Sequence, residues 1–232
     1  MSAIEVDLRL RSPHWSRVTT SVDTVNDGNG LWVRADHDCS DPTDPEVLAS
    51  HPGRLAAIRI DGDEVVLAQD RLRSWPLFWS LEDGLSGAQR LVVSDDATLM
   101  REAVSAPRLD ARARREFLDA GFVTGSDTLL AGIHQTEQGT VVRIDRATGR
   151  VRTINHSLGR FSEETDAVVA PEEFSDLLTE ALDAVMGRLL VDLDRRPGTP
   201  RLVIPLSGGL DSRLLVAWLT LHDALDRTVA FT

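Results

Sequence analysis

Residues 207–212 read Ser-Gly-Gly-Leu-Asp-Ser, and their types and spacing are suited to holding a phosphate group. Gly208 and Gly209 have no Cβ atom, so backbone N–H groups can approach an anion closely. The two serines add hydroxyl donors, and a helix beginning near Asp211 would add the positive end of its dipole. A Walker A loop is excluded because the chain contains no lysine, and a G-x-G-x-x-G fingerprint is also missing.

The segments around this loop predict a strand, a turn and a helix. Residues 202–206 are an apolar run typical of a buried strand, residues 211–225 predict a helix, and residues 228–231 predict a second buried strand. Ligands of open parallel sheets bind beyond the carboxyl ends of the strands, which is where the loop would lie. The competing interpretation is a tight strand–helix turn without a ligand, in which Asp211 is the helix N-cap.

A long amphipathic helix is expected before the first of these strands. Pro171 is suited to the first helical position, and the two glutamates after it are suited to the positive end of the helix dipole. Helix, strand, turn, helix and strand in this order are typical of the opening of a doubly wound parallel sheet. The apolar stripe of the helix repeats every 3.6 residues and consists of Phe174, Leu177, Leu178, Ala181, Leu182, Val185, Met186, Leu189 and Leu193.

The first 155 residues predict mixed sheet with a few helices. Asp61-Gly62 and residues 145–149 are typical of hairpin turns. Asp110 is suited to cap a helix that ends near residue 120, and a shorter helix is expected around residues 96–104. Short apolar or alternating runs predict strands at 4–10, 31–35, 55–60, 65–69, 76–81, 91–94, 140–144 and 151–154.

Composition excludes several classes of protein. The chain has 232 residues, of which 42% are hydrophobic, and this is enough for a substantial core. The net charge of −12 disfavours a surface for nucleic acid or anionic lipid. Cys39 is the single cysteine, so neither an internal disulfide nor a cysteine metal cluster is expected. The sequence contains no signal peptide and no run long enough to span a membrane, and a cytoplasmic location is therefore expected.

The loop and the segments before it resemble a known family. SGGLDS is similar to the pyrophosphate-binding loop of the N-type ATP pyrophosphatases. The preceding chain resembles the asparagine synthetase and β-lactam synthetase family, in the same order and over nearly the whole length. The residues that carry this resemblance are Glu46-Val47-Leu48, Gly53, Asp70-Arg71, Pro76-Leu77-Phe78, residues 91–95 and residues 133–139.

The resemblance implies two modules joined by a linker. Residues 1–155 would form an N-terminal-nucleophile (Ntn) hydrolase-like αββα sandwich, residues 156–170 the linker, and residues 171–232 the truncated beginning of a doubly wound, parallel-sheet PP-loop synthetase domain. Such a domain uses ATP and Mg²⁺ to adenylate a carboxylate, and an amine then displaces AMP to form an amide. Asp211 would help to position Mg²⁺. Arg213 stands where the family often has a second serine. The residues implied to bind ATP or pyrophosphate are Leu206, Ser207, Gly208, Gly209, Asp211 and Ser212.

The first module departs from the family at its nucleophile. Glutaminases of the family begin Met-Cys-Gly-Ile, whereas this chain begins Met-Ser-Ala-Ile, so Ser2 falls on the position of the catalytic cysteine. A serine hydroxyl is far less acidic than a thiol, and we therefore expect no glutaminase activity. β-Lactam synthetases and lasso-peptide cyclases share this loss and close an amide within a substrate that carries its own amine.

Three other functions stay open at this point. They are a glutamine-hydrolysing asparagine synthetase, a non-catalytic interaction module, and an Ntn hydrolase that uses Ser2. The substrate of the favoured ligase would be a small-molecule or peptide carboxylate. The synthetase domain is expected to be incomplete, and two explanations stay open. The favoured one is that the sequence belongs to a longer protein, and the other is that a homodimer or a partner subunit supplies the rest of the domain. In either case the chain alone is expected to be inactive.

Overall fold

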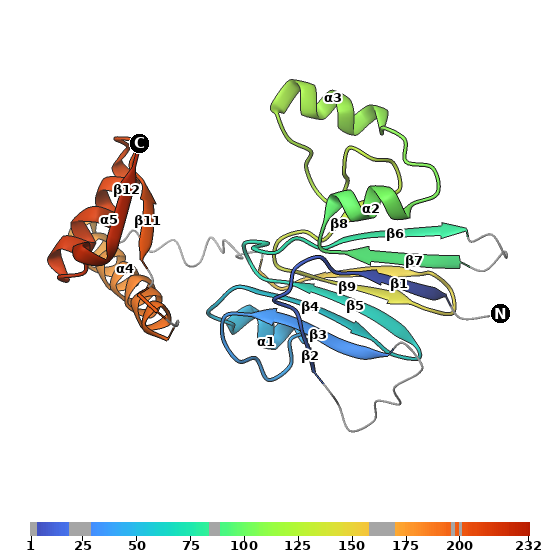
Figure 1. Cartoon of the computed structure of the whole chain (residues 1–232), viewed down its shortest axis with the longest axis horizontal. Coiled ribbons are helices and arrows are strands. Elements are labelled where there is room, and N and C mark those ends of the chain that lie inside the picture. The colour runs from blue at the N-terminus through green and yellow to red at the C-terminus, as the bar shows by residue number, and fades with distance from the viewer. Residues whose placement is uncertain (1–3, 19–28, 84–88, 158–169, 196–197, 200) are drawn as a thin grey trace. The chain divides into compact units, whose positions relative to one another are not determined.

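The computed structural model describes residues 4–18, 29–83, 89–157, 170–195, 198–199 and 201–232. These residues form mixed α and β structure with three sheets and few helices (Figure 1). The chain divides into two compact units, Met1–Arg160 and Phe161–Thr232. Most of the linker expected at 156–170 lies outside the described residues. Within the described ranges, no helix combines the length and the apolar character needed to cross a membrane.

The larger sheet of the N-terminal unit is antiparallel throughout, in the order β10-β9-β5-β4-β3-β2. Its strands are β2 (Ser16–Val18), β3 (Gly30–Ala35), β4 (Leu55–Ile60), β5 (Glu64–Gln69), β9 (Thr140–Asp145) and β10 (Val151–Asn155). Both predicted hairpin turns are confirmed, and an aspartate holds each of them. Asp61 Oδ1 accepts from two backbone N–H groups of the β4–β5 turn, and Asp145 Oδ1 does the same between β9 and β10.

The smaller sheet of this unit has the order β1-β7-β6-β8. Its strands are β1 (Glu5–Arg9), β6 (Phe78–Asp83), β7 (Gln89–Ser94) and β8 (His134–Gln135). β1 runs parallel to β7, and the other pairs are antiparallel. The eight strands predicted in this part of the chain are present. β2 and β8 were missed because strands of three and two residues are too short to display an alternating pattern.

The two sheets pack face to face and bury one continuous core, to which Ile58 and Leu67 contribute from one sheet and Leu91 from the other. Helix α1 (Pro45–Ser50) covers the outer face of the larger sheet through Leu48. Helix α2 (Ala97–Ala103) covers the outer face of the smaller sheet through Met100. The unit is therefore built in the order helix, sheet, sheet, helix (Figure 1).

Helix α3 (Ala111–Ala120) follows α2 and forms as predicted. The Asp110 side chain accepts a hydrogen bond from the backbone N–H of Ala113, at 2.8 Å, and so caps its first turn. Gly121 ends the helix with φ +83°, a left-handed conformation that favours glycine.

The C-terminal unit contains α4 (Pro171–Asp194), β11 (Leu202–Pro205), α5 (Leu210–Leu221), the 3₁₀ helix η2 (Leu225–Arg227) and β12 (Thr228–Phe231). β11 and β12 are parallel neighbours, and Pro171 opens α4 as predicted. α5 ends at Leu221 and not at residue 225. The reason is a left-handed residue, Asp223 (φ 52°), after which the backbone N–H of Ala224 returns to the carbonyl oxygen of Leu219.

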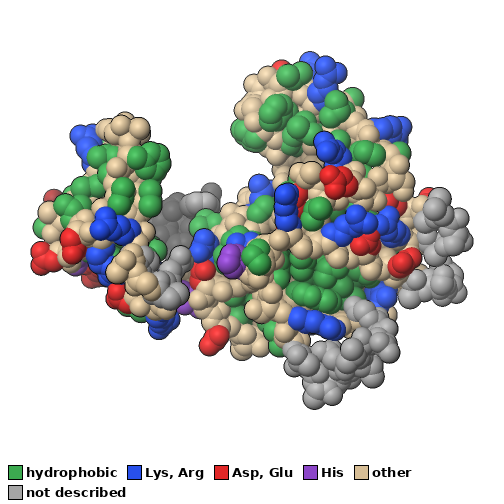
Figure 2. Space-filling model, in the orientation of Figure 1, with side chains coloured by type: hydrophobic (Ala, Val, Ile, Leu, Met, Phe, Trp, Pro, Cys, Tyr) green, Lys and Arg blue, Asp and Glu red, His purple; other side chains and the backbone are tan. Residues whose placement is uncertain are grey.

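The prediction that both strands of this unit are buried is wrong. Ile204 packs with Met186 of α4 and with Leu219 of α5, but Val203 and Phe231 are 63% and 56% exposed. A two-stranded sheet with its helices packed on Ile204 leaves the opposite side chains uncovered within the described residues. Figure 2 shows the resulting hydrophobic surface over β11 and β12. Likewise, of the nine stripe residues of α4, only Met186 and Leu193 are buried.

Asp70 is a buried carboxylate that joins separate parts of the N-terminal unit. It is 6% exposed and accepts hydrogen bonds from the backbone N–H groups of Leu55 (2.9 Å), Leu72 (2.7 Å) and Ser74 (3.3 Å). Its own carbonyl oxygen accepts from the N–H of Gly139, at 2.8 Å. Asp70 therefore connects the start of β4, the turn after β5 and the start of β9.

Replacing Asp70 with alanine should lower the free energy of unfolding by about 3 kcal/mol, because the buried N–H of Leu55 loses its acceptor. Urea unfolding followed by tryptophan fluorescence measures this loss, since four of the five tryptophans lie in the N-terminal unit. Asp119→Ala, on the exposed face of α3, should change the value by no more than about 0.5 kcal/mol. A loss below about 1 kcal/mol in Asp70→Ala would contradict this role.

Asp96 should stabilise α2 in a pH-dependent manner. Its carboxylate accepts from Arg11 Nη1 (2.8 Å) and from the N–H groups of Leu99 and Thr98, and these bonds lower its pKa. The stabilisation is therefore present above the pKa of an unfolded aspartate, about 4, and is lost as pH falls through the lower folded pKa. Asp96→Ala should cost about 1 kcal/mol at pH 7 in urea unfolding, and wild type and variant should converge near pH 2. If the free energies of unfolding of wild type and Asp96→Ala differed by the same amount at pH 7 and pH 2, the ionised Asp96 carboxylate would not be what stabilises α2.

Candidate functional site

The loop of residues 206–209 connects β11 to α5. Leu206 donates its backbone N–H to the carbonyl oxygen of Phe231, at 2.7 Å, so the pairing of β11 with β12 extends to the first residue of the loop. Parallel strands end at the same edge of a sheet, and the loop therefore lies at the carboxyl ends of both. Ser207, Gly208 and Gly209 are all exposed there.

The backbone conformation favours glycine at position 208 but not at position 209. Gly208 has φ +76°, which a residue with a side chain adopts only with strain. Gly209 has φ −70° and ψ 163°, an extended conformation open to any residue. A Cβ atom at Gly209 would meet only Ser207 Oγ, at 3.5 Å, which is ordinary contact. Neither strain nor packing therefore requires glycine at 209, and its effect is to keep the loop backbone open.

The backbone N–H groups of residues 207–212 donate to no acceptor among the described residues. Gly209 is the N-cap of α5 and supplies no side-chain cap, so the first-turn donors of this 12-residue helix are open. The competing interpretation named Asp211 as the N-cap, and this detail is wrong because Asp211 lies within the first turn. Open donors at a helix N-terminus can bind an anion.

Two side chains turn back onto the loop from α5. Ser212 Oγ and Arg213 Nε both donate to the carbonyl oxygen of Gly209, each at 3.3 Å. Arg213 thus brings a positive charge to the loop. It stands at the position where the family that the sequence resembles often has serine. The hydroxyl hydrogen of Ser212 is used within the loop, whereas its lone pairs remain available.

Asp211 provides an exposed carboxylate beside the loop and forms no ion pair within the described ranges. The described residues contain no group of three or more histidine, cysteine or acidic side chains that could hold a metal by themselves. One carboxylate is sufficient for Mg²⁺ when phosphate oxygens and water complete its shell. Asp211 therefore fits a Mg²⁺ that arrives with a nucleotide and does not fit a permanent protein-held metal.

Ser2, the residue at the nucleophile position, and the single cysteine, Cys39, both belong to the N-terminal unit. Ser2 lies outside the described residues, so its geometry is not part of the structure. Cys39 is half-buried and packs against the cluster beneath α1. Burial raises the pKa of the Cys39 thiol, which keeps the sulfur protonated and poorly nucleophilic at neutral pH.

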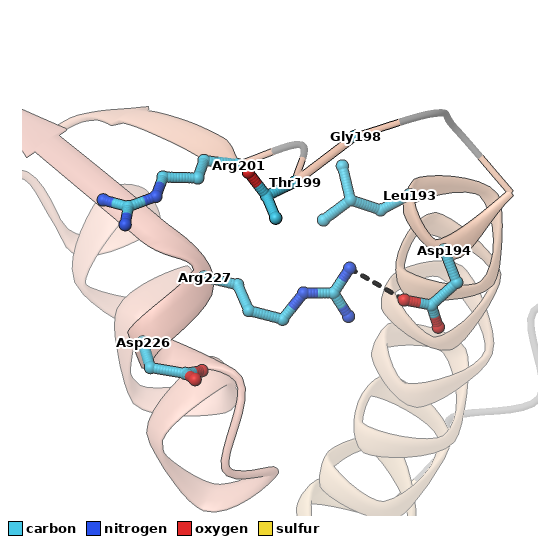
Figure 3. A pocket seen from close by; sticks show the side chains of 7 residues that line it. All are labelled: Leu193, Asp194, Gly198, Thr199, Arg201, Asp226 and Arg227. Carbon is cyan, nitrogen blue, oxygen red and sulfur yellow. Dashed lines mark ion pairs between the residues drawn. The ribbon is translucent and has the colours of Figure 1, made fainter.

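A pocket of about 310 Å³ lies at the opposite edge of the small sheet, where β11 and β12 begin. Arg227 extends across it and pairs with Asp194 at the end of α4, at 2.8 Å (Figure 3). Thr199 and Arg201 line it from the segment before β11. Sequence reasoning missed this pocket, and the only local signal was the glycine of the Arg-Pro-Gly-Thr-Pro segment. Because it lies at the amino ends of the strands, the pocket is separate from the loop.

No protein-family model matches this chain, and no curated protein matches it. A function must therefore be inferred from the chemistry of the loop, its position in the fold and the resemblance of the sequence segments.

Gly209→Ala should weaken the binding of pyrophosphate about tenfold without unfolding the protein. The added methyl group is compatible with the backbone conformation and meets only Ser207 Oγ, at 3.5 Å. It should keep a phosphate from approaching the loop backbone closely and so weaken binding by about 1.4 kcal/mol. Titration calorimetry with pyrophosphate measures the affinity, and circular dichroism confirms folding. Gly187→Ala, in α4 with open space around it, is the matched control and should bind as the wild type does. Equal affinity in Gly209→Ala and wild type would exclude the loop as the anion site.

Proposed function

We propose that this chain is part of an ATP-dependent, amide-forming ligase that activates a carboxylate by adenylation. The observation that carries the proposal is the open Ser-Gly-Gly-Leu-Asp-Ser loop at the carboxyl ends of two parallel strands, with its backbone N–H groups unbonded within the described residues. The finer fold assignments belong to the same proposal. They are an Ntn hydrolase-like sandwich for the N-terminal unit and a PP-loop synthetase sheet for the C-terminal unit.

In this proposal, different residues of the loop bind different parts of ATP and its Mg²⁺. The N–H groups of Gly208 and Gly209 and the hydroxyl of Ser207 bind phosphate oxygens, while Arg213 adds positive charge. Ser212 lies in the first turn of α5, and Leu206 borders the nucleotide. Asp211 holds Mg²⁺ together with the phosphates. ATP supplies the adenylate group that makes the substrate carboxylate reactive toward an amine.

The nitrogen donor is proposed to be an amine of the substrate and not glutamine. Ser2 replaces the cysteine that the resembling glutaminases use, and the thiol of Cys39 is held protonated by burial. This favours a β-lactam synthetase or peptide macrolactam cyclase type of ligase over a glutamine-hydrolysing asparagine synthetase. The chain itself contains no lysine that could act as a base in the amide-forming step.

The sheet of the C-terminal unit has one exposed apolar face, which is consistent with further structure packing on it. Val203, Val229 and Phe231 leave 63%, 42% and 56% of their surface exposed on one face. In the proposed ligase this face is covered by the rest of a larger synthetase sheet, from the same polypeptide, a second copy or a partner subunit. We therefore expect residues 1–232 to bind ATP but not to form an amide.

The same exposed face also supports a second candidate, a non-catalytic interaction module, because an apolar surface of this kind is typical of binding sites for proteins. The two candidates differ in one property. The ligase requires affinity for ATP at the loop, whereas the interaction module has none. A Ser2-dependent hydrolase would instead lose its activity in Ser2→Ala.

The test is calorimetric binding of ATP in the presence of MgCl₂. Wild type should bind, and Ser207→Ala should bind about tenfold more weakly, because a hydrogen bond to a charged phosphate is worth about 1.5 kcal/mol. Glutamine should not be hydrolysed, and Ser2→Ala should change nothing. Absence of ATP binding would overturn the ligase and leave the interaction module.

The matched control lies at the other edge of the same sheet. Arg201 lines the pocket at the amino ends of β11 and β12 and is exposed, so Arg201→Gln should preserve both folding and ATP affinity. If Arg201→Gln abolished ATP binding while Ser207→Ala retained it, the nucleotide site would be the pocket and not the loop.

A further inference from the structure

Two arginines of the N-terminal unit contact the same tryptophan. The guanidinium carbon of Arg34 lies 4.3 Å from the centroid of the Trp75 ring, and that of Arg54 lies 4.9 Å from it. Arg34 is on β3 opposite Ala56, a residue of the core between the sheets. Trp32, two residues earlier on the same face of β3, also packs against this core. Arg34 therefore lies at the margin of the inter-sheet core.

Only one of these two guanidiniums is neutralised. Arg54 forms a two-point contact with Asp36, with Nε–Oδ2 at 2.6 Å and Nη2–Oδ1 at 3.0 Å. Arg34 forms no ion pair or hydrogen bond with its side chain in the described part of the chain, and its Nε is buried without an acceptor. Partial burial lowers the pKa of Arg34. A buried donor without an acceptor destabilises a protein, and this chain has an excess of carboxylates that could have supplied one.

Asp95 is a nearby carboxylate that is already in use. Its negative charge raises the pKa of Arg34, against the larger effect of burial. Its Oδ1 accepts from the N–H of Arg11, at 2.7 Å, and its Oδ2 accepts from the N–H of Ser12 and from Trp15 Nε1, at 3.0 and 2.9 Å. These three bonds hold the Asp95 carboxylate on the segment after β1, so it does not form an ion pair with Arg34.

We propose that Arg34, Trp32 and Trp75 form a binding site for a small-molecule carboxylate that carries an apolar group. A guanidinium binds a carboxylate through two parallel hydrogen bonds, as Arg54 binds Asp36, and a ligand would supply the acceptor that Arg34 lacks. The indole rings provide the apolar surface for the rest of the ligand. This site lies in the N-terminal unit and does not depend on the ligase proposed above.

The local charges favour a monoanion. Three positive charges lie at or beside the two indole rings, on Arg17, Arg34 and Arg54. The negative charges that act on Arg34 or Arg54 are also three, Asp36, Asp70 and Asp95, so these six groups are neutral in sum before a ligand binds. A carboxylate adds one negative charge to this partly buried region, whereas a phosphate adds up to two and is penalised more strongly. A polar amino acid such as glutamine gains little from the indole rings.

Titration calorimetry with phenylacetate tests the site directly. We expect saturable binding with a dissociation constant of roughly 1 mM, which is typical of a ligand with ten non-hydrogen atoms. Phenylacetamide, which has the same shape without the charge, should bind at least tenfold more weakly. Inorganic phosphate and L-glutamine should also bind at least tenfold more weakly than phenylacetate.

Arg34→Gln should reduce phenylacetate affinity at least tenfold while circular dichroism shows a folded protein. Arg115→Gln, on α3 with a side chain that is 87% exposed, should bind as the wild type does. The Nε–Hε resonance of Arg34, assigned as the signal missing from Arg34→Gln, should shift on addition of phenylacetate. The proposal is overturned by equal binding of phenylacetamide, by unchanged affinity in Arg34→Gln, by tighter binding of phosphate or glutamine, or by no saturable binding at about ten times the expected constant.

Discussion

The parallel pairing of β11 with β12 is the constraint on which the candidate site depends. The register from Leu202 opposite Thr228 to Pro205 opposite Phe231 requires a crossover, and α5 with η2 provides it. Because both strands point the same way, the chain leaves β11 at their common carboxyl edge. The loop is consequently exposed, and the N-terminus of α5 opens toward solvent with its donors unbonded. An antiparallel pair with a short turn would have satisfied these backbone groups within the sheet.

The two units differ in how they bury apolar surface. In the N-terminal unit, two sheets cover each other and a helix covers each outer face, so Ile58 and Leu91 are fully buried. In the C-terminal unit, Ile204 and Leu219 form a small core with α4, and the other side of the sheet is uncovered within the described residues. Burial stabilises a protein in proportion to the apolar area removed from water. The C-terminal unit therefore gains less from its own contacts, and a covering partner or domain would stabilise it further.

Both proposed binding sites contain hydrogen-bond donors that have no acceptor among the described residues. Donors in folded proteins are normally paired, and those that are not are candidates for ligand contacts. At the loop the open donors are neutral N–H groups, and a helix dipole and Arg213 favour an anion. At Arg34 the open donor is a charged guanidinium beside indole rings, so the ligand must be both anionic and apolar. The two sites differ in chemistry because one uses backbone dipoles in solvent and the other uses a charge at the margin of a core.

The sequence by itself determined the features that local interactions control. Alternating or apolar runs predicted the longer strands, the aspartates at 61 and 145 predicted the hairpin turns, and Asp110 predicted the start of α3. The order strand, Ser-Gly-Gly-Leu-Asp-Ser loop, helix was also predictable, because glycine and cap residues act over a few positions. Only the tertiary structure decided that Phe231 is exposed and that Arg34 shares Trp75 with Arg54. These features depend on which segments distant in sequence come into contact, and the pattern of a single segment carries no information about its neighbours in space.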